Sequence, residues 1–288
     1  MHRSEEAKKL AEELSKRDRP SCEETERQIA HALAAGYVPS DPAGMRFEDF
    51  PTGRVLYANE DSSSDVTVFF MHGGGFMLDF TPFHRGFMKM LLEGADVTLV
   101  AVGYKTIPFG TYREALDLIL PLYRGYVHDN PRKKTVFIGD SCGATIALSV
   151  IQMLRSEGER VPDEIILVSP WTDLSMTNPD IEEYAKRDPW MTVPWLSVCG
   201  RHWIGDLDIH DPLVSPMYGD FSGLRNVLVF TGTAEVLYPD TVKFFGKLDR
   251  DPSNEIVIAE GLTHDYAIHP IPEGEDARRK MFERMVQG

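Results

Sequence analysis

The sequence contains only three cysteines, Cys22, Cys142 and Cys199, and none of them has the C-x-x-C spacing of a zinc site or a redox pair. An odd number of cysteines without such spacing also argues against a disulfide framework. No Asn-x-Ser/Thr glycosylation acceptor occurs in the chain. We therefore expect free thiols, an intracellular protein and no metal site.

Basic residues and long apolar runs are also scarce. The chain has 30 Lys and Arg against 45 Asp and Glu, a net charge of −15, which argues against nucleic acid or anionic lipid as a partner. No segment is long and apolar enough to span a bilayer, and the N-terminal MHRSEEAKKLAEELSKRD lacks the apolar stretch of a signal peptide. These absences predict a cytoplasmic protein with no nucleic-acid or membrane partner.

Strand and helix signals alternate along most of the chain. With 288 residues, 42% of them hydrophobic, we expect one domain over residues 1–288. Apolar runs without polar alternation predict parallel strands, and the helical patterns between them predict helices on both faces of a mostly parallel central sheet, an α/β fold. The expected strands are 46–50 and 53–60 as an antiparallel hairpin, then 65–71, 97–102, 135–138, 164–168, 226–231 and 255–259. The expected helices are 112–127, interrupted by Pro121, a helix from residue 142, and 272–286.

Two segments stand outside this alternation. Residues 4–35 have three- and four-residue apolar spacings broken by a proline, which predict two short helices, and the stripe Ile29, Leu33, Val38 is expected to cover a surface. Residues 175–211 lose periodicity and are rich in tryptophan, which indicates an insertion near a pocket. A solvated appendage is the alternative for the first segment, and an ordinary core helix for the second.

Residues 134–154 predict a strand, a tight turn and a helix around a serine. Gly139 and Gly143 flank Ser141 in a G-x-S-x-G pattern, and both positions must lack bulk if strand and helix are to approach closely. The helix N-terminus would direct unpaired N–H groups at negative charge that forms beside the serine. This arrangement is typical of a nucleophile elbow, although the pattern also occurs by chance.

A second glycine-rich segment, His-Gly-Gly-Gly-Phe at residues 72–76, directly follows a predicted buried strand. A flexible linker is the alternative, but linkers have polar flanks and this segment lies between apolar ones. Three glycines in such a place allow backbone N–H groups to approach a ligand atom, as an oxyanion hole requires. His72 by itself is expected to orient the loop by hydrogen bonds.

An elbow serine needs a base and an acid, in the chain order serine, acid, histidine. Glu235 follows one predicted strand and His264 follows the last one, so both lie where a parallel sheet presents its ligands. His269 is the rival base and Asp240 the rival acid. Glu235 could instead compensate the charge of a helix N-terminus.

Four motifs, in this order, resemble the hormone-sensitive-lipase-like branch of the α/β hydrolases: HGGGF at 72–76, GDSCG at 139–143, DPLVSP at 211–216, and G-x-x-E-x-L at 232–237 followed by His264. The likeness extends from about residue 66 to residue 269 and includes SPWTDL at 169–174. It implies an α/β-hydrolase fold with a helical cap, which here would consist of approximately residues 1–40 and 175–211.

The resemblance also implies a catalytic machinery. It assigns Ser141 as nucleophile, His264 as base and Glu235 as acid. The oxyanion donors it implies are the backbone amides of Gly73, Gly74 and Cys142. The reaction would be carboxylic ester hydrolysis with no cofactor.

The sequence departs from the family pattern at three places. The elbow has Cys142 and Ala144 where the family mostly has Ala and Gly, which leaves the donated backbone N–H in place. Position 235 is more often Asp, although the longer Glu235 can orient a histidine in the same way. Residues 104–109, YKTIPF, lack the Ala-Pro-Glu usual after the tyrosine, so a change in local packing is expected there.

We therefore predict a serine carboxylesterase that forms an acyl-enzyme and acts on small-molecule esters with short acyl chains. The aromatic residues of segment 175–211 would cover the pocket, and this cover would limit the length of the acyl chain. The alternatives are a binding protein of the same fold without catalysis, and a hydrolase of amides or carbamates. The intact His264 argues against the first. The sequence leaves open a homo-oligomer.

Overall fold

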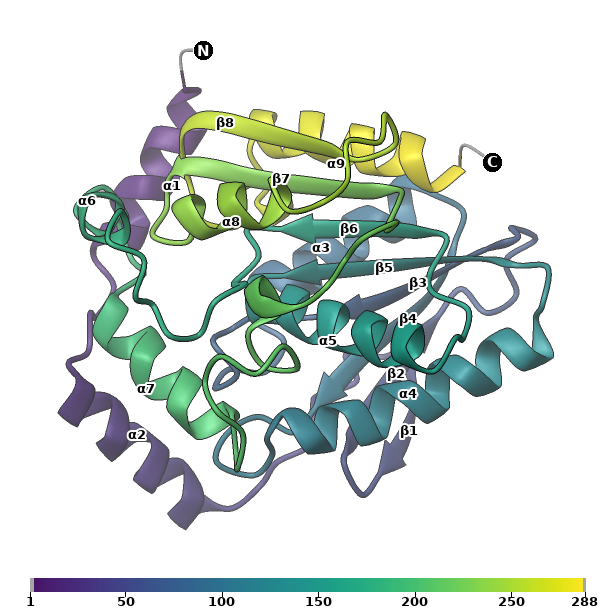
Figure 1. Cartoon of the computed structure of the whole chain (residues 1–288), viewed down its shortest axis with the longest axis horizontal. Helices are drawn as coiled ribbons and strands as arrows, with labels where there is room; N and C mark the ends of the chain where they lie inside the picture. Colours follow the sequence, from purple (N-terminus) through teal and green to yellow (C-terminus); the bar gives the residue numbers. More distant parts are fainter. Residues whose placement is uncertain (1–2, 287–288) are drawn as a thin grey trace.

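The computed structural model describes residues 3–286, and its core is a sheet of eight strands (Figure 1). The ends of the expected domain and cap, residues 1–2 and 287–288, lie outside the described residues. In spatial order the strands are β1 (Arg46–Phe50), β2 (Gly53–Ala58), β4 (Thr98–Tyr104), β3 (Val66–Met71), β5 (Lys134–Asp140), β6 (Glu164–Val168), β7 (Val227–Ala234) and β8 (Glu255–Thr263).

The sheet is mostly parallel, as predicted. Strands β1 and β2 form the antiparallel hairpin, β2 also pairs antiparallel with β4, and all pairs from β4 to β8 are parallel. The helices are α1 (Glu5–Ser15), α2 (Cys22–Ala35), α3 (Pro82–Gly94), α4 (Tyr112–Asp129), α5 (Cys142–Ser156), α6 (Ile181–Ala185), α7 (Val193–Trp203), α8 (Tyr238–Phe245) and α9 (Pro272–Val286), with short 3-10 helices at Pro216–Tyr218 and Tyr266–Ile268.

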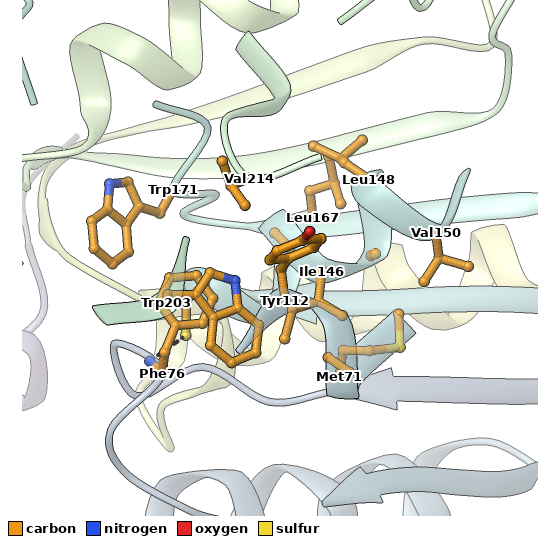
Figure 2. Close-up of a cluster of buried hydrophobic side chains, with 14 of the residues drawn as sticks. Met71, Phe76, Tyr112, Ile146, Leu148, Val150, Leu167, Trp171, Trp203 and Val214 are labelled. Carbon is orange, nitrogen blue, oxygen red and sulfur yellow. Dashed lines mark hydrogen bonds between the residues drawn. The ribbon is translucent and has the colours of Figure 1, made fainter. Parts of the chain in front are cut away.

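Helices cover both faces of the sheet because successive strand side chains point to opposite sides. Phe69 and Phe137 belong to the core shared with α4 and α5, part of which is drawn in Figure 2. Phe70 and Ile138 belong to the core shared with α3 and α9. The apolar runs in the central strands are therefore buried on both faces, as the sequence predicted.

Helix α4 corrects one prediction. It runs without interruption from Tyr112 to Asp129, with Pro121 inside it. Pro121 lies on the exposed face, so the carbonyl that loses its partner can reach water, while Leu118 and Ile119 stay buried against the sheet. Packing of the buried face outweighs the cost of the proline.

Helix α3 was not predicted, although its start carries a clear signal. Thr81 caps the helix by accepting from the His84 N–H, the His84 side chain in turn accepts from the Thr81 N–H, and Pro82 occupies the first turn. This capping by a histidine in place of Glu or Gln brings His84 to the inner end of the helix, beside β5. The helix therefore carries a polar residue to the sheet edge where the elbow lies.

The N-terminal segment forms the two expected helices, but the expected stripe is wrong. Ile29 is buried, whereas Leu33 is 60% and Val38 77% exposed. Thr25 and Ile29, one helical turn apart, form the buried face of α2, and the helix packs against α7. Val38 lies beyond the end of the helix. Segment 175–211 contains α6 and α7.

None of the helices in residues 3–286 is long and apolar enough to cross a lipid bilayer.

Candidate active site

Ser141 stands at the sharp turn between β5 and α5. Its backbone has φ 52° and ψ −120°, a strained conformation for a residue with a side chain. The flanking glycines are required by space: a Cβ on Gly143 would lie 2.1 Å from the Met71 carbonyl oxygen, and one on Gly139 would lie 2.7 Å from the Ala144 backbone. The Ser141 Oγ has no hydrogen-bond partner among the described residues.

The glycine-rich loop faces this elbow. Gly74 has φ 106° and Gly75 has φ 61°, a region that favours glycine. The Trp195 ring from α7 would lie 2.1 Å from a Cβ on Gly75, so the ring packs directly on the loop backbone. Phe76 stacks on Trp203 of α7, with ring centroids 4.2 Å apart (Figure 2). Helix α7 therefore packs against this loop through two tryptophan rings.

Cys142 ties the loop to the elbow through its side chain. Its Sγ accepts a hydrogen bond from the Phe76 N–H at 3.1 Å, and the Tyr104 hydroxyl lies 3.6 Å from the same sulfur. Burial raises the pKa of the Cys142 thiol to about 12, so it stays neutral. The departure from the family pattern at this position thus adds a contact while it leaves the backbone amide in place.

The unusual segment 104–109 also fastens the loop. The Tyr104 hydroxyl donates to the His72 carbonyl at 2.9 Å, and the two rings stack with centroids 4.4 Å apart. The Ile107 N–H donates to the Phe76 carbonyl at 2.8 Å. His72 itself is fully buried, and its Nδ1 lies 2.7 Å from the Gly73 carbonyl oxygen. Contacts at both ends therefore fix the conformation of the loop.

Asp140 and His84 are site residues that sequence reasoning missed. The His84 Nε2 lies 3.0 Å from the Asp140 Oδ2. Burial by itself would raise the pKa of Asp140, but His84, His72 and the Gly73 amide hold it below its usual value. Asp140 directly precedes the elbow serine, so it joins the elbow to the glycine loop and to α3.

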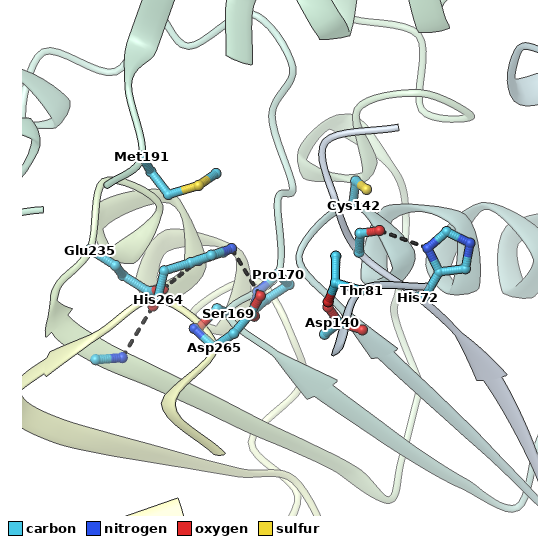
Figure 3. A network of polar contacts seen from close by, with 12 residues as sticks. His72, Thr81, Asp140, Cys142, Ser169, Pro170, Met191, Glu235, His264 and Asp265 are labelled. Carbon is cyan, nitrogen blue, oxygen red and sulfur yellow. Dashed lines mark hydrogen bonds and ion pairs between the residues drawn. The ribbon is translucent and has the colours of Figure 1, made fainter. Parts of the chain in front are cut away.

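Glu235 and His264 meet, as the sequence predicted (Figure 3). The His264 Nδ1 lies 2.8 Å from the Glu235 Oε2, and both side chains are buried. The other oxygen of Glu235 accepts from the Thr231 hydroxyl and, at 3.1 Å, from the Gly232 N–H. With both oxygens occupied, the carboxylate is fixed and orients the imidazole.

Two further carboxylates surround this histidine. The Asp265 Oδ2 lies 3.2 Å from the His264 Nε2. Asp188 accepts from the backbone N–H groups of Trp190, Met191 and Val236 at 2.8–2.9 Å, which joins the segment before α7 to the turn that carries Glu235. Burial opposes a charge on His264, but Asp265, Glu235 and Asp188 together raise its pKa to about 9.

The rival residues lie elsewhere or lack the needed contacts. The Asp240 Oδ1 accepts from the Asn178 side-chain amide at 2.7 Å and is not brought to His264. His269 lines the same pocket as Ser141, with its ring 4.4 Å from that of Phe83, but no carboxylate among the described residues contacts it. Burial and the charge of His264 lower the pKa of His269 to about 3.

One cavity of about 240 Å³ opens onto both Ser141 and His264. Its walls are largely aromatic and aliphatic and come from the α1–α2 connection, the glycine loop, the start of α3, the start of α7 and the turn after β8. Arg19 from the α1–α2 connection donates to the carbonyls of Asp188 and Met191 at 3.2 and 3.1 Å, so the N-terminal segment is fixed to the segment before α7. Within residues 3–286, no group of three or more potential ligands is arranged to hold a metal ion.

Replacement of Cys142 tests its role as a structural thiol. Cys142→Ala should lower the free energy of unfolding by about 1–2 kcal/mol, since the Phe76 N–H loses its partner, and should lower kcat by less than about tenfold, since the position-142 amide remains. Urea unfolding and ester turnover measure both effects. In the native protein a thiol reagent should modify the exposed Cys22 and spare Cys142. Rapid modification of Cys142 would contradict this assignment.

Comparison with known proteins gives consistent results. A family model described as alpha/beta hydrolase fold matches residues 68–268. An esterase of Acinetobacter venetianus is 32% identical over 210 residues, which cover 72% of this chain and 67% of that protein. An acetyl-hydrolase of Streptomyces hygroscopicus is 28% identical over 60% of this chain and 58% of that protein. The crystal structure of an esterase from the bacterial hormone-sensitive lipase family has a TM-score of 0.78 at 20% identity, with 100% of both chains covered.

The matched range includes the glycine loop, the elbow and the Glu235–His264 pair. The relative from Acinetobacter venetianus shares about a third of its aligned residues and most of its length with this chain. The structural neighbour shares the fold over the whole length. The chain therefore belongs to the α/β-hydrolase family, as a carboxylic ester hydrolase.

Proposed function

We propose that the chain is a serine carboxylesterase that hydrolyses short-chain acyl esters of small alcohols through an acyl-enzyme at Ser141. The observation that carries the proposal is that the strained elbow serine and the buried His264–Glu235 pair open onto one cavity. The name of one relative, an acetyl-hydrolase, supports a short acyl group. The strained turn presents the Ser141 hydroxyl to the cavity, and no group within residues 3–286 is hydrogen-bonded to it.

In the proposed first half-reaction, the Ser141 Oγ attacks the ester carbonyl carbon while the His264 Nε2 accepts the hydroxyl proton. Glu235 keeps the Nδ1 proton in place and stabilises the imidazolium that forms. The tetrahedral intermediate collapses, the alcohol leaves with the proton from Nε2, and Ser141 carries the acyl group. A water molecule then repeats the sequence and releases the acid.

The negative oxygen of the intermediate needs backbone donors. We propose the amides of Gly73, Gly74 and Cys142 as these donors: Gly74 has the positive φ of a turned backbone, and Cys142 is at the N-terminus of α5, where the helix dipole favours negative charge.

We also propose that the N-terminal helices and segment 175–211 act together as a cap over the site. Their contacts with each other support this: α2 packs on α7, with the Glu26 carboxylate 2.8 Å from the His202 Nε2. The N–H and hydroxyl of Ser4, at the start of α1, donate to the Glu273 carboxylate. These bonds attach the first helix to α9, which packs on the sheet. The cap supplies the Trp190 and Trp195 walls of the cavity.

Substitution of the proposed triad tests the mechanism. Ser141→Ala and His264→Ala should each lower kcat by about 10⁴-fold or more, and the double variant should lose no more than either one, because the residues act as a unit. Glu235→Gln should lower kcat by up to about 10⁴-fold, since the amide favours the wrong imidazole tautomer.

The matched control is Asp240→Asn, which removes a buried carboxylate close in sequence but bonded to Asn178. It should change kcat little. A larger loss with Asp240→Asn than with Glu235→Gln, or with His269→Ala than with His264→Ala, would contradict the assignment. Circular dichroism verifies that each variant is folded.

The size of the cavity predicts the acyl specificity. Its volume of about 240 Å³ lies below the range of about 300–1,000 Å³ typical of sites for drug-sized ligands. Each CH₂ group that stays outside loses roughly 0.8 kcal/mol of burial. Across nitrophenyl esters from acetyl to palmitoyl, all kept below their aggregation concentration, kcat/KM should peak between acetyl and hexanoyl. A steady rise to palmitoyl, or rapid hydrolysis of emulsified triglyceride, would show an open site.

A further inference from the structure

Both ring nitrogens of His264 face carboxylate oxygens. The Nδ1 contacts Glu235 at 2.8 Å, and the Nε2, the atom that must accept the Ser141 proton in the proposed mechanism, contacts the Asp265 Oδ2 at 3.2 Å. The Ser141 Oγ meanwhile has no partner among the described residues. In this state the Asp265 carboxylate, and not the Ser141 hydroxyl, contacts the Nε2 atom of His264.

The backbone holds Asp265 in this position. The residue has φ 58° and ψ 24°, the left-handed conformation, which Asp tolerates better than most residues. Its N–H donates to the Ser169 Oγ at 3.0 Å (Figure 3). The side chain is 7% exposed and lines the cavity, and its Oδ1 has no hydrogen-bond partner among the described residues. The carboxyl group is therefore fixed beside the imidazole and faces the substrate space.

The contact between Nε2 and Oδ2 requires a proton. In neutral His264 the Nδ1 donates to Glu235, so the Nε2 presents a lone pair, and an ionised Asp265 presents another. Two acceptors repel each other at 3.2 Å. One proton between them turns the repulsion into attraction between an imidazolium and a carboxylate. When that proton is lost, the contact loses its attraction and the Nε2 lone pair becomes available to Ser141.

The surrounding charges favour this shared proton. The titratable groups that face the His264–Asp265 pair come from four places: Glu235 after β7, Asp188 before α7, Asp140 at the end of β5, and His269 after the last 3-10 helix. The carboxylates among them attract a proton. Burial keeps His269 neutral, so it does not oppose the proton.

We propose that Asp265 is a positioning residue that holds the protonated Nε2 of His264 in the free enzyme and releases it to Ser141 when the shared proton is lost. This inference rests on the proposed function, because it assigns a resting state to the same base. The enzyme would thus become active as the pair deprotonates, which places the acid limb of the kcat/KM profile in the alkaline range, in line with the raised pKa of His264 of about 9.

The test removes the carboxylate and keeps the backbone conformation. Asp265→Asn removes the charge and keeps a residue that accepts a left-handed φ. Asp265→Gly is also compatible with that φ and leaves no side chain that could contact the His264 Nε2. Both variants should move the acid limb of kcat/KM down by at least one pH unit, so that turnover below the wild-type limb rises about tenfold. Asp117→Asn, which removes an exposed carboxylate of α4, is the matched control and should leave the limb in place.

A titration that needs no turnover separates this inference from the proposed function. Nitrogen-15 NMR of histidine-labelled full-length protein, with the His264 signal assigned by its loss in His264→Gln, should give a wild-type pKa clearly above 6.5 and a value at least one unit lower in both Asp265 variants. A wild-type His264 that titrates at or below 6.5 would overturn the inference, as would folded Asp265 variants with an unchanged value. Absence of ester turnover with the expected titration would overturn the proposed function alone.

Discussion

Close backbone packing between the end of β3 and the turn that joins β5 to α5 is the constraint on which the site depends. Gly143 lies against the Met71 carbonyl so tightly that no side chain fits, and Gly139 lies against the first turn of α5. This packing brings the elbow serine next to the glycine loop, because the loop is the direct continuation of β3. Because β5, β6, β7 and β8 are parallel, the turns that follow β7 and β8 lie at the same edge of the sheet as the elbow.

Buried charge is the second feature that shapes the molecule. Glu235, Asp188 and Asp265 all lie near one histidine in a chain that is already strongly acidic. Burial of carboxylates is costly unless they are hydrogen-bonded. Backbone N–H groups and a hydroxyl donate to Glu235 and Asp188, whereas one oxygen of Asp265 has no hydrogen-bond partner in the described part of the chain. The least satisfied carboxylate is thus the one that faces the substrate, which is typical of a residue with a role in function.

The sequence predicted the elements and residues that local chemistry determines. The apolar runs predicted the parallel strands, and the position of Glu235 and His264 after two predicted strands indicated that they meet. It did not predict Asp140–His84 or the approach of Asp265 to the base, since these depend on a helix cap and on one left-handed residue. The sequence also predicted the wrong contact face for α2, because an apolar stripe does not determine which of its residues pack against the partner helix. The arrangement of residues 175–211 was the hardest part to predict, since it depends on contacts such as those of Arg19 with the carbonyls of residues 188 and 191.

The most direct test of the central claim is covalent capture of the nucleophile. A small alkyl fluorophosphonate resembles the tetrahedral intermediate and reacts with a serine that a neighbouring base activates. Intact-mass and peptide analysis should find a single adduct on Ser141 in the wild-type protein and none in Ser141→Ala, with labelling strongly slowed in His264→Ala. Hydrolysis of esters by a protein whose Ser141 stays unmodified, or an adduct on another residue, would contradict the account.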